Sequence, residues 1–466
     1  SSMRGDGSFT LLGARTPFRM SSGQSTDGKG TRLHVTAEPG ERPRMVDIDG
    51  TLTFDNGAPN FDGVLVLTKA MDAKAAEQGQ PWKVTSRIKV NPSLVTFDQV
   101  EAAYGPDDNA LRLTGSGDMR FGTSPLLKLA LAARQLDADK LLANGSANAE
   151  PLRLLPALRV IVPSLPVLPL PAQIESSADQ VAVGGRALLN VAATLQANDK
   201  SWTVGKFEMR APGATRVVAS GTISTPGPSA RFSGPVSIES SDPDVLTAWL
   251  QGRSDATYRN QKPLRLRGDA VIAADRIGLD GMKAEINGGK IDGSIALLTT
   301  ADNKTRLEAV LSAPSLDVES VSSLVSVLAG PQSAWPDEAQ IALDAERAVV
   351  AGQEVRPVGF TLSYGSKAIA LERIQIGDAG SDLAVAGTGS FDRFDGKGRL
   401  SLDAAAPSLA RVGAMVAPFA PAVAQRLNGL DVLGAVKTKL SAEFVQERAR
   451  TNVRAAFDID ASQMKG

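Results

Sequence analysis

Few side chains in this sequence could carry out nucleophilic, acid–base or metal chemistry. The 466 residues include one histidine, His34, and no cysteine. A Ser-His-Asp triad needs a histidine placed by a partner acid, two-histidine metal sites need a second histidine, and zinc–thiolate sites need cysteine. Because His34 stands beside Arg32 in a polar stretch, we expect a solvated histidine on a strand rather than a catalytic one.

Three glycine-rich stretches resemble cofactor loops without completing one. Residues 23–30 approach a phosphate-binding loop, but Gly30 follows Lys29 where Ser or Thr would coordinate magnesium. Gly115-Ser-Gly117 and Gly387-Thr-Gly389 lack the third glycine of a dinucleotide fingerprint and lie inside expected strands, where small residues mark bends or close packing. We therefore predict no bound cofactor.

Paired carboxylates offer a second possible chemistry. The pairs are Asp107 with Asp108, Asp137 with Asp139, and Asp317 with Glu319. Two of these pairs lie where we expect helices to begin. Because the helix dipole favours negative charge at that end, we interpret these carboxylates as helix caps. A glycan-modifying enzyme would need an acidic cleft with two closely spaced carboxylates, which no sequence signal supports.

Charge and aromatic content narrow the class of partner. The chain carries 50 basic and 51 acidic residues, and both signs are scattered, so no basic face is offered to nucleic acid. Aromatic residues are 5% of the chain, too few for stacking platforms, and the four tryptophans are spread out as core anchors would be. The absence of cysteine is compatible with an oxidising compartment.

Alternation of apolar and polar residues is the dominant pattern. In residues 46–54 Val46, Ile48, Leu52 and Phe54 alternate with Asp and Thr, and turn signals such as Asp55-Asn-Gly57 follow such runs. The pattern predicts a mainly β fold, an elongated, curled antiparallel sheet with a few short helices between strand groups. We expect helices near 242–250, 315–328 and 408–427.

One phrase recurs along the chain: alternating strands followed by a Leu-rich, usually acidic segment. The chain of 466 residues is longer than one compact core usually holds, so the repeated phrase predicts a repetitive β body. Copies of the phrase are Leu111-Arg-Leu-Thr-Gly-Ser-Gly117 through Leu129-Ala-Leu131 to Leu136-Asp-Ala-Asp139, Gly293–Leu297 through Leu307–Leu311 to Leu316-Asp-Val-Glu319, Leu383-Ala-Val-Ala-Gly-Thr-Gly389 through Leu400-Ser-Leu402 to Pro407-Ser-Leu-Ala410, and a looser one from Val217 to Leu246.

A proline-rich apolar segment separates the first strand group from the second. Residues 151–171 contain six prolines and two arginines, which deny them a continuous membrane-spanning helix. We interpret the segment as an apolar connection packed over a sheet, with a mobile flap as the alternative. The expected organisation is a first β segment over 1–150 that ends in a short acidic helix, the proline-rich connection over 151–180, a second β segment over 181–330 and a third over 331–466.

The repeated phrase resembles the AsmA family of bacterial envelope proteins, which is related to TamB. The residues that carry the resemblance are Trp82-Lys-Val-Thr, the Leu-x-Gly-x-Gly run ending at Gly117, the small-residue strand from Pro125 and the segment from Leu136; the copy at 383–412 has Ala410 and Arg411 in place of the acidic pair. The resemblance implies a taco-like β-groove in the periplasm, an inner-membrane anchor outside this chain, contact of the full-length protein with both membranes, and a part in phospholipid transport or outer-membrane biogenesis.

The abundance of aliphatic strand residues favours a non-enzymatic, monomeric lipid-binding body. A groove lined by aliphatic side chains can hold phospholipid or fatty-acid chains, since each buried methylene contributes about 0.8 kcal/mol. The alternative is a structural or adhesive β-solenoid with a closed, dry core, in which the same side chains simply pack. The candidate lining residues are Leu129, Leu131, Leu297, Leu307, Leu400 and Leu402.

Overall fold

The structure of the protein is a computed structural model that describes most of the chain. The structure describes residues 3–464 with the exception of 12–13, 25–29, 39–43, 70–80, 107–109, 140–157, 160–161, 163–167, 169, 225–228, 251–262, 287–288, 301, 303, 318–335, 351–352, 379–382, 409, 411–424, 426–431 and 448–449.

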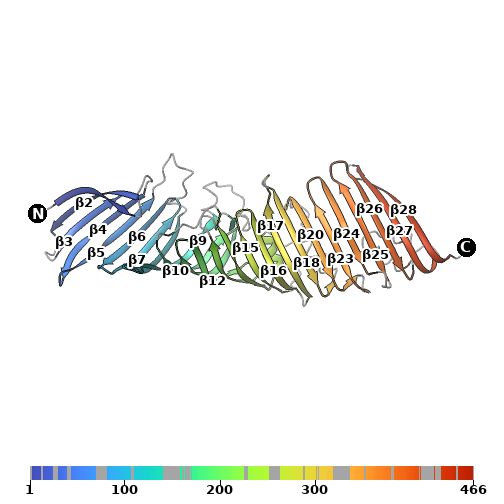
Figure 1. Ribbon diagram of the computed structural model, residues 1–466, viewed down its shortest axis with the longest axis horizontal. Coiled ribbons are helices and arrows are strands. Elements are labelled where there is room, and N and C mark those ends of the chain that lie inside the picture. The colour runs from blue at the N-terminus through green and yellow to red at the C-terminus, as the bar shows by residue number, and fades with distance from the viewer. Residues whose placement is uncertain are drawn as a thin grey trace. The chain divides into compact units, whose positions relative to one another are not determined.

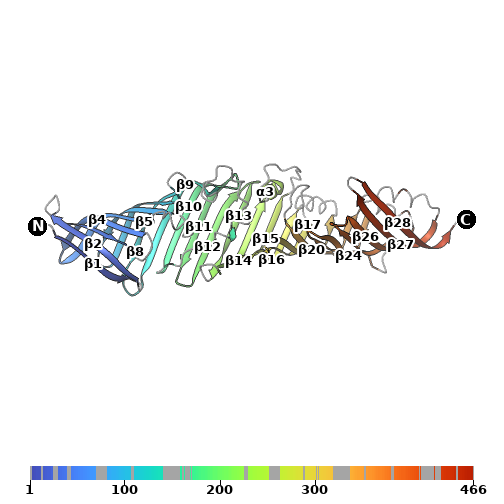
Figure 2. The same cartoon turned by 90° about the horizontal axis from the view of Figure 1, so that it is seen from above.

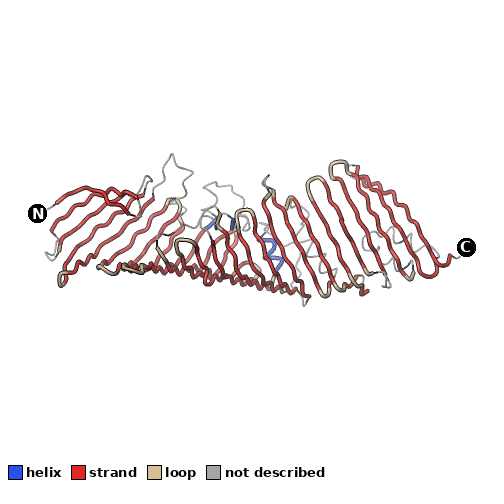
Figure 3. The backbone as a smooth tube through the Cα atoms, in the orientation of Figure 1, coloured by secondary structure: helices blue, strands red, loops and turns tan. Residues whose placement is uncertain are grey.

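The described chain is mainly β, as the alternation predicts (Figures 1 and 3). It divides into two units: unit 1 holds residues 1–240 and 248–256, and unit 2 holds residues 241–247 and 257–466. In each unit the strands of the main sheet lie side by side (Figure 2). Within unit 1, β1 (Met3–Leu11) has one described partner strand, and within unit 2 the same is true of β28 (Arg450–Met464).

In unit 1 each strand pairs with the next along the chain, from β1 to β14. All of these pairs are antiparallel apart from β9 with β10, which are parallel. The strands after β1 are β2 (Ala14–Gln24), β3 (Thr31–Ala37), β4 (Arg44–Asp55), β5 (Ala58–Lys69), β6 (Trp82–Val90), β7 (Leu94–Tyr104), β8 (Leu111–Arg120), β9 (Leu126–Asp137), β10 (Ala172–Val183), β11 (Arg186–Ala197), β12 (Ser201–Ala211), β13 (Thr215–Ser224) and β14 (Arg231–Ser240).

Unit 2 follows the same plan with a small second sheet. Its main sheet is antiparallel apart from the parallel pair β18–β20, and β19, β21 and β22 form the small sheet. The strands before β28 are β15 (Leu264–Ile272), β16 (Arg276–Ile286), β17 (Gly289–Thr299), β18 (Thr305–Ala313), β19 (Leu316–Asp317), β20 (Glu338–Ala345), β21 (Ala348–Val350), β22 (Gln353–Val355), β23 (Val358–Tyr364), β24 (Ala368–Ile376), β25 (Ala384–Asp392), β26 (Lys397–Ala406) and β27 (Val432–Glu447).

The parallel pairs β9–β10 and β18–β20 of the main sheets correct the expectation of a purely antiparallel meander, and β19 and β21 of the small sheet are parallel as well. Each main-sheet pair follows an acidic copy of the repeated phrase, at Leu136-Asp137 and at Leu316-Asp317. A parallel neighbour requires the chain to return to the starting edge of the sheet, so it needs a long connection rather than a tight turn. Short-range alternation carries no information about where such returns fall.

The two acidic segments begin in strands rather than helices, although Ala138 and Asp139, directly after the first strand, are helical. Leu136 and Asp137 are the last residues of β9, and Leu316 and Asp317 form β19. Both pairs therefore lie in extended backbone. Most of the helices expected at 315–328 and 408–427 and most of the connection at 151–171 lie outside the described residues, although Val162 within that connection is buried.

Glycine and bulges bend the strands within each sheet. The predicted hairpin at Asp55-Asn-Gly57 has positive φ at both Asn56 (49°) and Gly57 (83°), as a tight turn between twisted strands requires. Inside strands, the register shifts between Leu279 and Met282, where Gly281 has φ 56°. Each such bulge bends its strand and increases the local twist, which favours a curled sheet.

A short helix, α3 (Pro243–Leu250), lies in the segment where the sequence indicates one. The Asp242 carboxylate accepts a hydrogen bond from the Val245 N–H at 3.2 Å, which caps the first turn. Trp249, 2% exposed, donates its indole N–H to the Val183 carbonyl at the end of β10, at 2.9 Å. With Trp202 3% exposed as well, these two tryptophans are core anchors.

Candidate functional site

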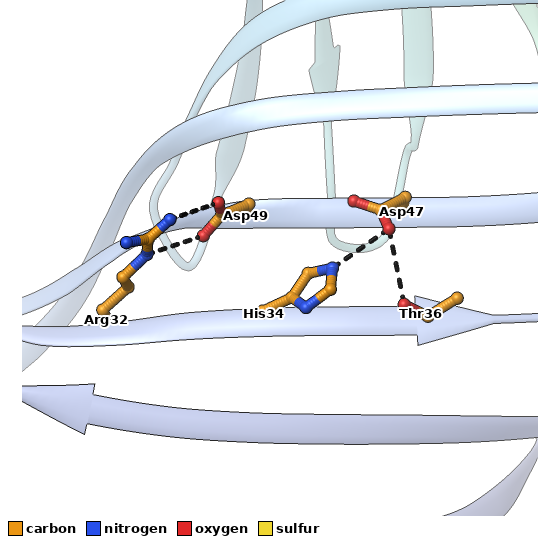
Figure 4. Close-up of polar contacts among 5 residues, drawn as sticks. All are labelled: Arg32, His34, Thr36, Asp47 and Asp49. Carbon is orange, nitrogen blue, oxygen red and sulfur yellow. Dashed lines mark hydrogen bonds and ion pairs between the residues drawn. The ribbon is translucent and has the colours of Figure 1, made fainter. Parts of the chain in front are cut away.

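The polar face of unit 1 places His34 in a cross-strand ladder between β3 and β4 (Figure 4). His34 Nε2 lies 3.0 Å from Asp47 Oδ2, and Thr36 donates to the same oxygen at 3.4 Å. Arg32 donates to both oxygens of Asp49, at 3.1 and 2.7 Å, and these bonds lower the pKa of the Asp49 carboxyl. His34 is thus an exposed strand residue, as expected, in a ladder whose polar groups pair with one another.

The predicted carboxylate pairs are not brought together into a site. Asp139 lies just past β9, and its two carboxylate oxygens accept the N–H groups of Gly184 and Gly185, at 2.7 and 2.8 Å, in the β10–β11 turn. Asp317 lies in β19, whereas Asp107, Asp108 and Glu319 are outside the described residues. Across the described chain, no group of three or more His, Asp or Glu side chains could hold a metal ion.

A second backbone clamp of this kind, at Asp337, escaped the sequence reasoning. Its Oδ2 accepts the backbone N–H of Thr305 at 2.7 Å and the Thr305 hydroxyl at 2.9 Å. These bonds, the backbone one first, lower the pKa of the Asp337 carboxyl. Because Arg306 pairs with Glu338, the clamp locks the starts of β18 and β20 together.

In unit 1 the candidate residues Leu129 and Leu131 pack over glycines of the neighbouring strand. Leu129 is opposite Gly117 and Leu131 is opposite Gly115 in the β8–β9 pair. A Cβ at Gly117 would lie 2.7 Å from Leu129 Cδ2, so the leucine fills the space that the glycine leaves. The glycines therefore serve close packing, as predicted, and both leucines keep part of their surface accessible.

Unit 2 repeats this arrangement with Leu400 and Leu402. Leu402 is opposite Gly387 and Leu400 is opposite Gly389 in the β25–β26 pair. A Cβ at Gly387 would lie 2.5 Å from Leu402 Cδ2, and one at Gly389 would lie 3.1 Å from Leu400 Cδ1. Both leucines are half-buried.

The last two candidates, Leu297 and Leu307, face each other across β17 and β18. Leu297 is 5% exposed and is therefore a core residue. Leu307 is half-buried. Five of the six candidates thus keep accessible apolar surface, and Leu297 lies in the core.

Strand register joins these residues into three apolar rows that cross unit 2 at right angles to its strands. Directly paired residues point to the same face, so each row is a continuous stripe. The first row is Gly293, Leu311, Leu343, Phe360, Ile374, Gly387, Leu402 and Leu440. The second row is Ile295, Ala309, Ile341, Leu362, Leu371, Gly389, Leu400 and Ala442. The third row is Leu297, Leu307, Ala339, Tyr364, Ile369, Phe391 and Gly398.

These rows contain functional candidates that the sequence reasoning missed. Ile341, Leu362 and Leu371 lie between the predicted pairs in the second row, and all three are half-buried. Their alternation with polar residues could have indicated them, but register alone shows that they continue the line to Leu400.

One margin of the apolar face in unit 2 is sealed. The small sheet contributes Ala348 and Val355, which are 0% and 6% exposed. They belong to one buried cluster with residues from the ends of the main strands, among them Leu343 at 3%. The apolar face therefore combines a dry margin with a central region of half-buried side chains.

In unit 1 one margin of the sheet is buried under bulky side chains that the sheet itself contributes. A fourth stripe crosses β4 to β14 there, and its Trp202 and Phe232 are 3% and 7% exposed. Its members are Leu52, Phe61, Val90, Val95, Met119, Leu127, Ala172, Ala197, Trp202, Ile223 and Phe232.

Two hollows lie over β24–β28. Their volumes are about 1120 and 730 Å³, and they share Glu372, Thr388 and Ser401 as lining residues. The larger is bordered by charged side chains of both signs, including Lys439 and Asp458. Both hollows also border the apolar rows: the larger is lined in part by Ile374 and Gly387 of the first row, and the smaller by Leu371 and Leu400 of the second row.

Neither a scan of the sequence against protein-family models nor a search of curated proteins finds a match. No helix among the described residues is both long and apolar enough to span a bilayer.

Proposed function

We propose that the apolar faces of the two units bind the acyl chains of phospholipids or fatty acids, and that the protein is a non-enzymatic lipid carrier. The observation that carries the proposal is the set of three continuous apolar rows in unit 2, with half-buried leucines at Leu307, Leu400 and Leu402. The resemblance of the repeated phrase to AsmA-family proteins supports a periplasmic carrier that is anchored to the inner membrane and serves outer-membrane biogenesis.

The dimensions and energetics of the rows suit an acyl chain. Eight strands at about 4.8 Å spacing give the first two rows a length of about 34 Å. A sixteen-carbon chain that loses its water on such a surface gains on the order of 10 kcal/mol before the cost of ordering it. Transfer of this kind requires an apolar surface and no catalytic group.

A structural β-solenoid with a closed core is the alternative, and the buried cluster around Leu343 favours it at one margin. In that case the leucines of the rows would contribute packing alone. The two functions differ in whether a lipid can displace solvent from the half-buried centre of the face.

The test is acyl-chain binding by the whole chain and by a double variant, Leu400→Asn with Leu402→Asn. We expect the wild type to carry phospholipid on purification, detected by native mass spectrometry, and to bind a fluorescent fatty acid. The double variant should bind the fatty acid at least about tenfold more weakly, because two apolar contacts are lost.

A matched control on the same strand is Ser401→Asn with Asp403→Asn, which alters the polar face. It should bind within about twofold of wild type. Hydrogen exchange across β25–β27 must match between the two variants, so that a folding defect is not counted as lost binding. No lipid on the purified protein together with no fatty-acid binding would falsify the proposal.

A further inference from the structure

The turn between β25 and β26 exposes a phenylalanine almost completely. Phe394 is 95% exposed, the highest value among the large hydrophobic side chains of the described residues. The turn that carries it is ordered: the Asp392 carboxylate accepts the N–H groups of Phe394 and Asp395 at 2.8 and 3.0 Å. The apolar ring is therefore held in water by a preformed turn.

The neighbouring β23–β24 turn braces this tip. The Arg393 guanidinium lies 5.1 Å from the centroid of the Tyr364 ring and donates to the Tyr364 hydroxyl and the Gly365 carbonyl, both at 3.1 Å. The Arg393 N–H also donates to the Lys367 carbonyl at 2.8 Å. Two adjacent hairpin turns thus form one rigid corner, and Tyr364 links it to the third apolar row.

Within residues 364–367 and 392–397 of this corner, three cations outnumber two acids. Lys367, Arg393 and Lys397 are exposed, and none of them forms an ion pair with a described carboxylate. Asp392 is turned toward backbone N–H groups, Asp395 is exposed, and a third acid, Glu338 of β20, lies beside Gly365. Three cations around an exposed aromatic ring match the chemistry of a bilayer surface, where rings enter the headgroup region and cations meet phosphates.

We propose that this corner, formed by Lys367 and residues 392–397, docks the protein onto an anionic lipid surface. Phe394 enters the boundary between headgroups and acyl chains, while Lys367, Arg393 and Lys397 contact lipid phosphates. The contact is independent of acyl-chain binding on the apolar rows, so either can hold without the other.

The test is flotation of the whole chain with vesicles of equal parts phosphatidylcholine and phosphatidylglycerol. Wild type should float with these vesicles at low salt and much less with phosphatidylcholine alone. Phe394→Ser should weaken the partition coefficient about tenfold. Lys367→Gln and Lys397→Gln should each weaken it about fivefold, and added salt should reduce the effect of both lysines.

A variant that binds vesicles more strongly provides a control, because an unfolded protein would not gain binding. Asp395→Asn removes the exposed acid beside Phe394 and should strengthen partitioning several-fold. The matched control is Phe54→Ser: Phe54 is 67% exposed at the β4–β5 hairpin, beside Asp55 and with no cation in its turn. This control should leave flotation unchanged.

The proposal is overturned if wild type fails to float with anionic vesicles, if Phe394→Ser floats like wild type, or if Phe54→Ser loses as much. Capture of a protein partner through Phe394 without vesicle binding would also overturn it. Phe394→Ser should still bind a fluorescent fatty acid in solution, and the Leu400/Leu402 double variant should still float. Failure of lipid docking is therefore distinguishable from failure of acyl-chain binding.

Discussion

Strands β8–β10 of unit 1 and β25–β27 of unit 2 use the same local packing with different third strands. In both, a Gly-x-Gly strand is paired with a Leu-x-Leu strand so that each leucine faces a glycine. Beyond the leucines, unit 1 continues in parallel to Ile174 and Ser176 on β10, whereas unit 2 continues antiparallel to Leu440 and Ala442 on β27. The packing of the two strands is thus the repeated element. The direction of the next strand does not depend on this packing, because the two units share the packing and differ in that direction.

The acidic residues after the leucines accompany that difference. The copies of the phrase that contain Asp137 and Asp317 are followed by parallel neighbours, and the copy with Ala410 is followed by an antiparallel one. At both parallel junctions an aspartate binds backbone N–H groups: Asp139 at the β10–β11 turn and Asp337 at Thr305. Such clamps hold a strand that no tight hairpin connects to its neighbour.

The largest expected effect is an added methyl group at the two glycine strands. A Cβ at Gly115 would run into the Ala130 backbone carbonyl, which cannot move without breaking the β8–β9 pair, whereas a Cβ at Gly389 would meet the flexible end of Leu400 at 3.1 Å. We expect Gly115→Ala to destabilise β8–β9 by about 3 kcal/mol and Gly389→Ala to cost about 1 kcal/mol or less.

Hydrogen exchange of the amides in β8–β9 and β25–β26 measures both changes locally, without assuming that the two units unfold together. Equal losses of protection at the two sites would contradict the difference in packing that the structure gives Gly115 and Gly389. The position that matches Gly115 in unit 2 is Gly387, where a Cβ would also meet a backbone carbonyl, that of Ser401.

Much of the fold follows from local sequence. Alternation at Val46, Ile48, Leu52 and Phe54 predicts a strand because one face is buried and the other wet, and Asn56 and Gly57 tolerate positive φ. Parallel pairing cannot be predicted in this way, since it depends on where a long connection returns. The sequence around Asp337 accordingly gives no hint that its carboxylate meets Thr305, 32 residues away.

The candidate site was predictable in kind but not in extent. Leucine alternation indicates which face of a strand is apolar, and it places Leu400 and Leu402 on one face of β26. It could not distinguish buried Leu297 from half-buried Leu307, because burial depends on which side chains of other strands cover each one. The row from Leu400 to Ile341 is continuous because of the strand register. Bulges change that register, as between Leu371 and Ile374.

A smaller effect is expected from loss of the clamp in unit 1. Asp139→Asn replaces one acceptor oxygen with an amide donor and removes the charge, so the N–H groups of Gly184 and Gly185 lose a charge-assisted acceptor. We expect about 2 kcal/mol less protection of the β10–β11 turn in hydrogen exchange. Asp179→Asn, an exposed change on β10 itself, should leave protection unaltered. Unchanged exchange at Gly184 in Asp139→Asn would mean that the parallel junction holds without its clamp.

The smallest effect concerns the pH dependence of the Asp337 clamp in unit 2. Bonds from the Thr305 N–H and hydroxyl lower the pKa of this carboxyl in the folded chain below its value in the unfolded chain. The clamp is therefore fully present above the ordinary carboxyl pKa of about 4 and is lost as the pH falls through the lower folded value. Because Asp337 is exposed, we expect it to contribute less than about 1 kcal/mol.

Carbon-detected NMR titration of the aspartate carboxyls, assigned with Asp337→Asn, measures this pKa. Thr305→Val removes the hydroxyl but keeps the backbone N–H, so it should move the Asp337 pKa only part of the way back toward its ordinary value. A complete return would assign the shift to the hydroxyl and leave the backbone bond without effect. In that case the two parallel junctions would be held by different kinds of hydrogen bond. The Asp337 carboxylate would depend on the Thr305 side chain at β18–β20, whereas the Asp139 carboxylate accepts backbone N–H groups in unit 1.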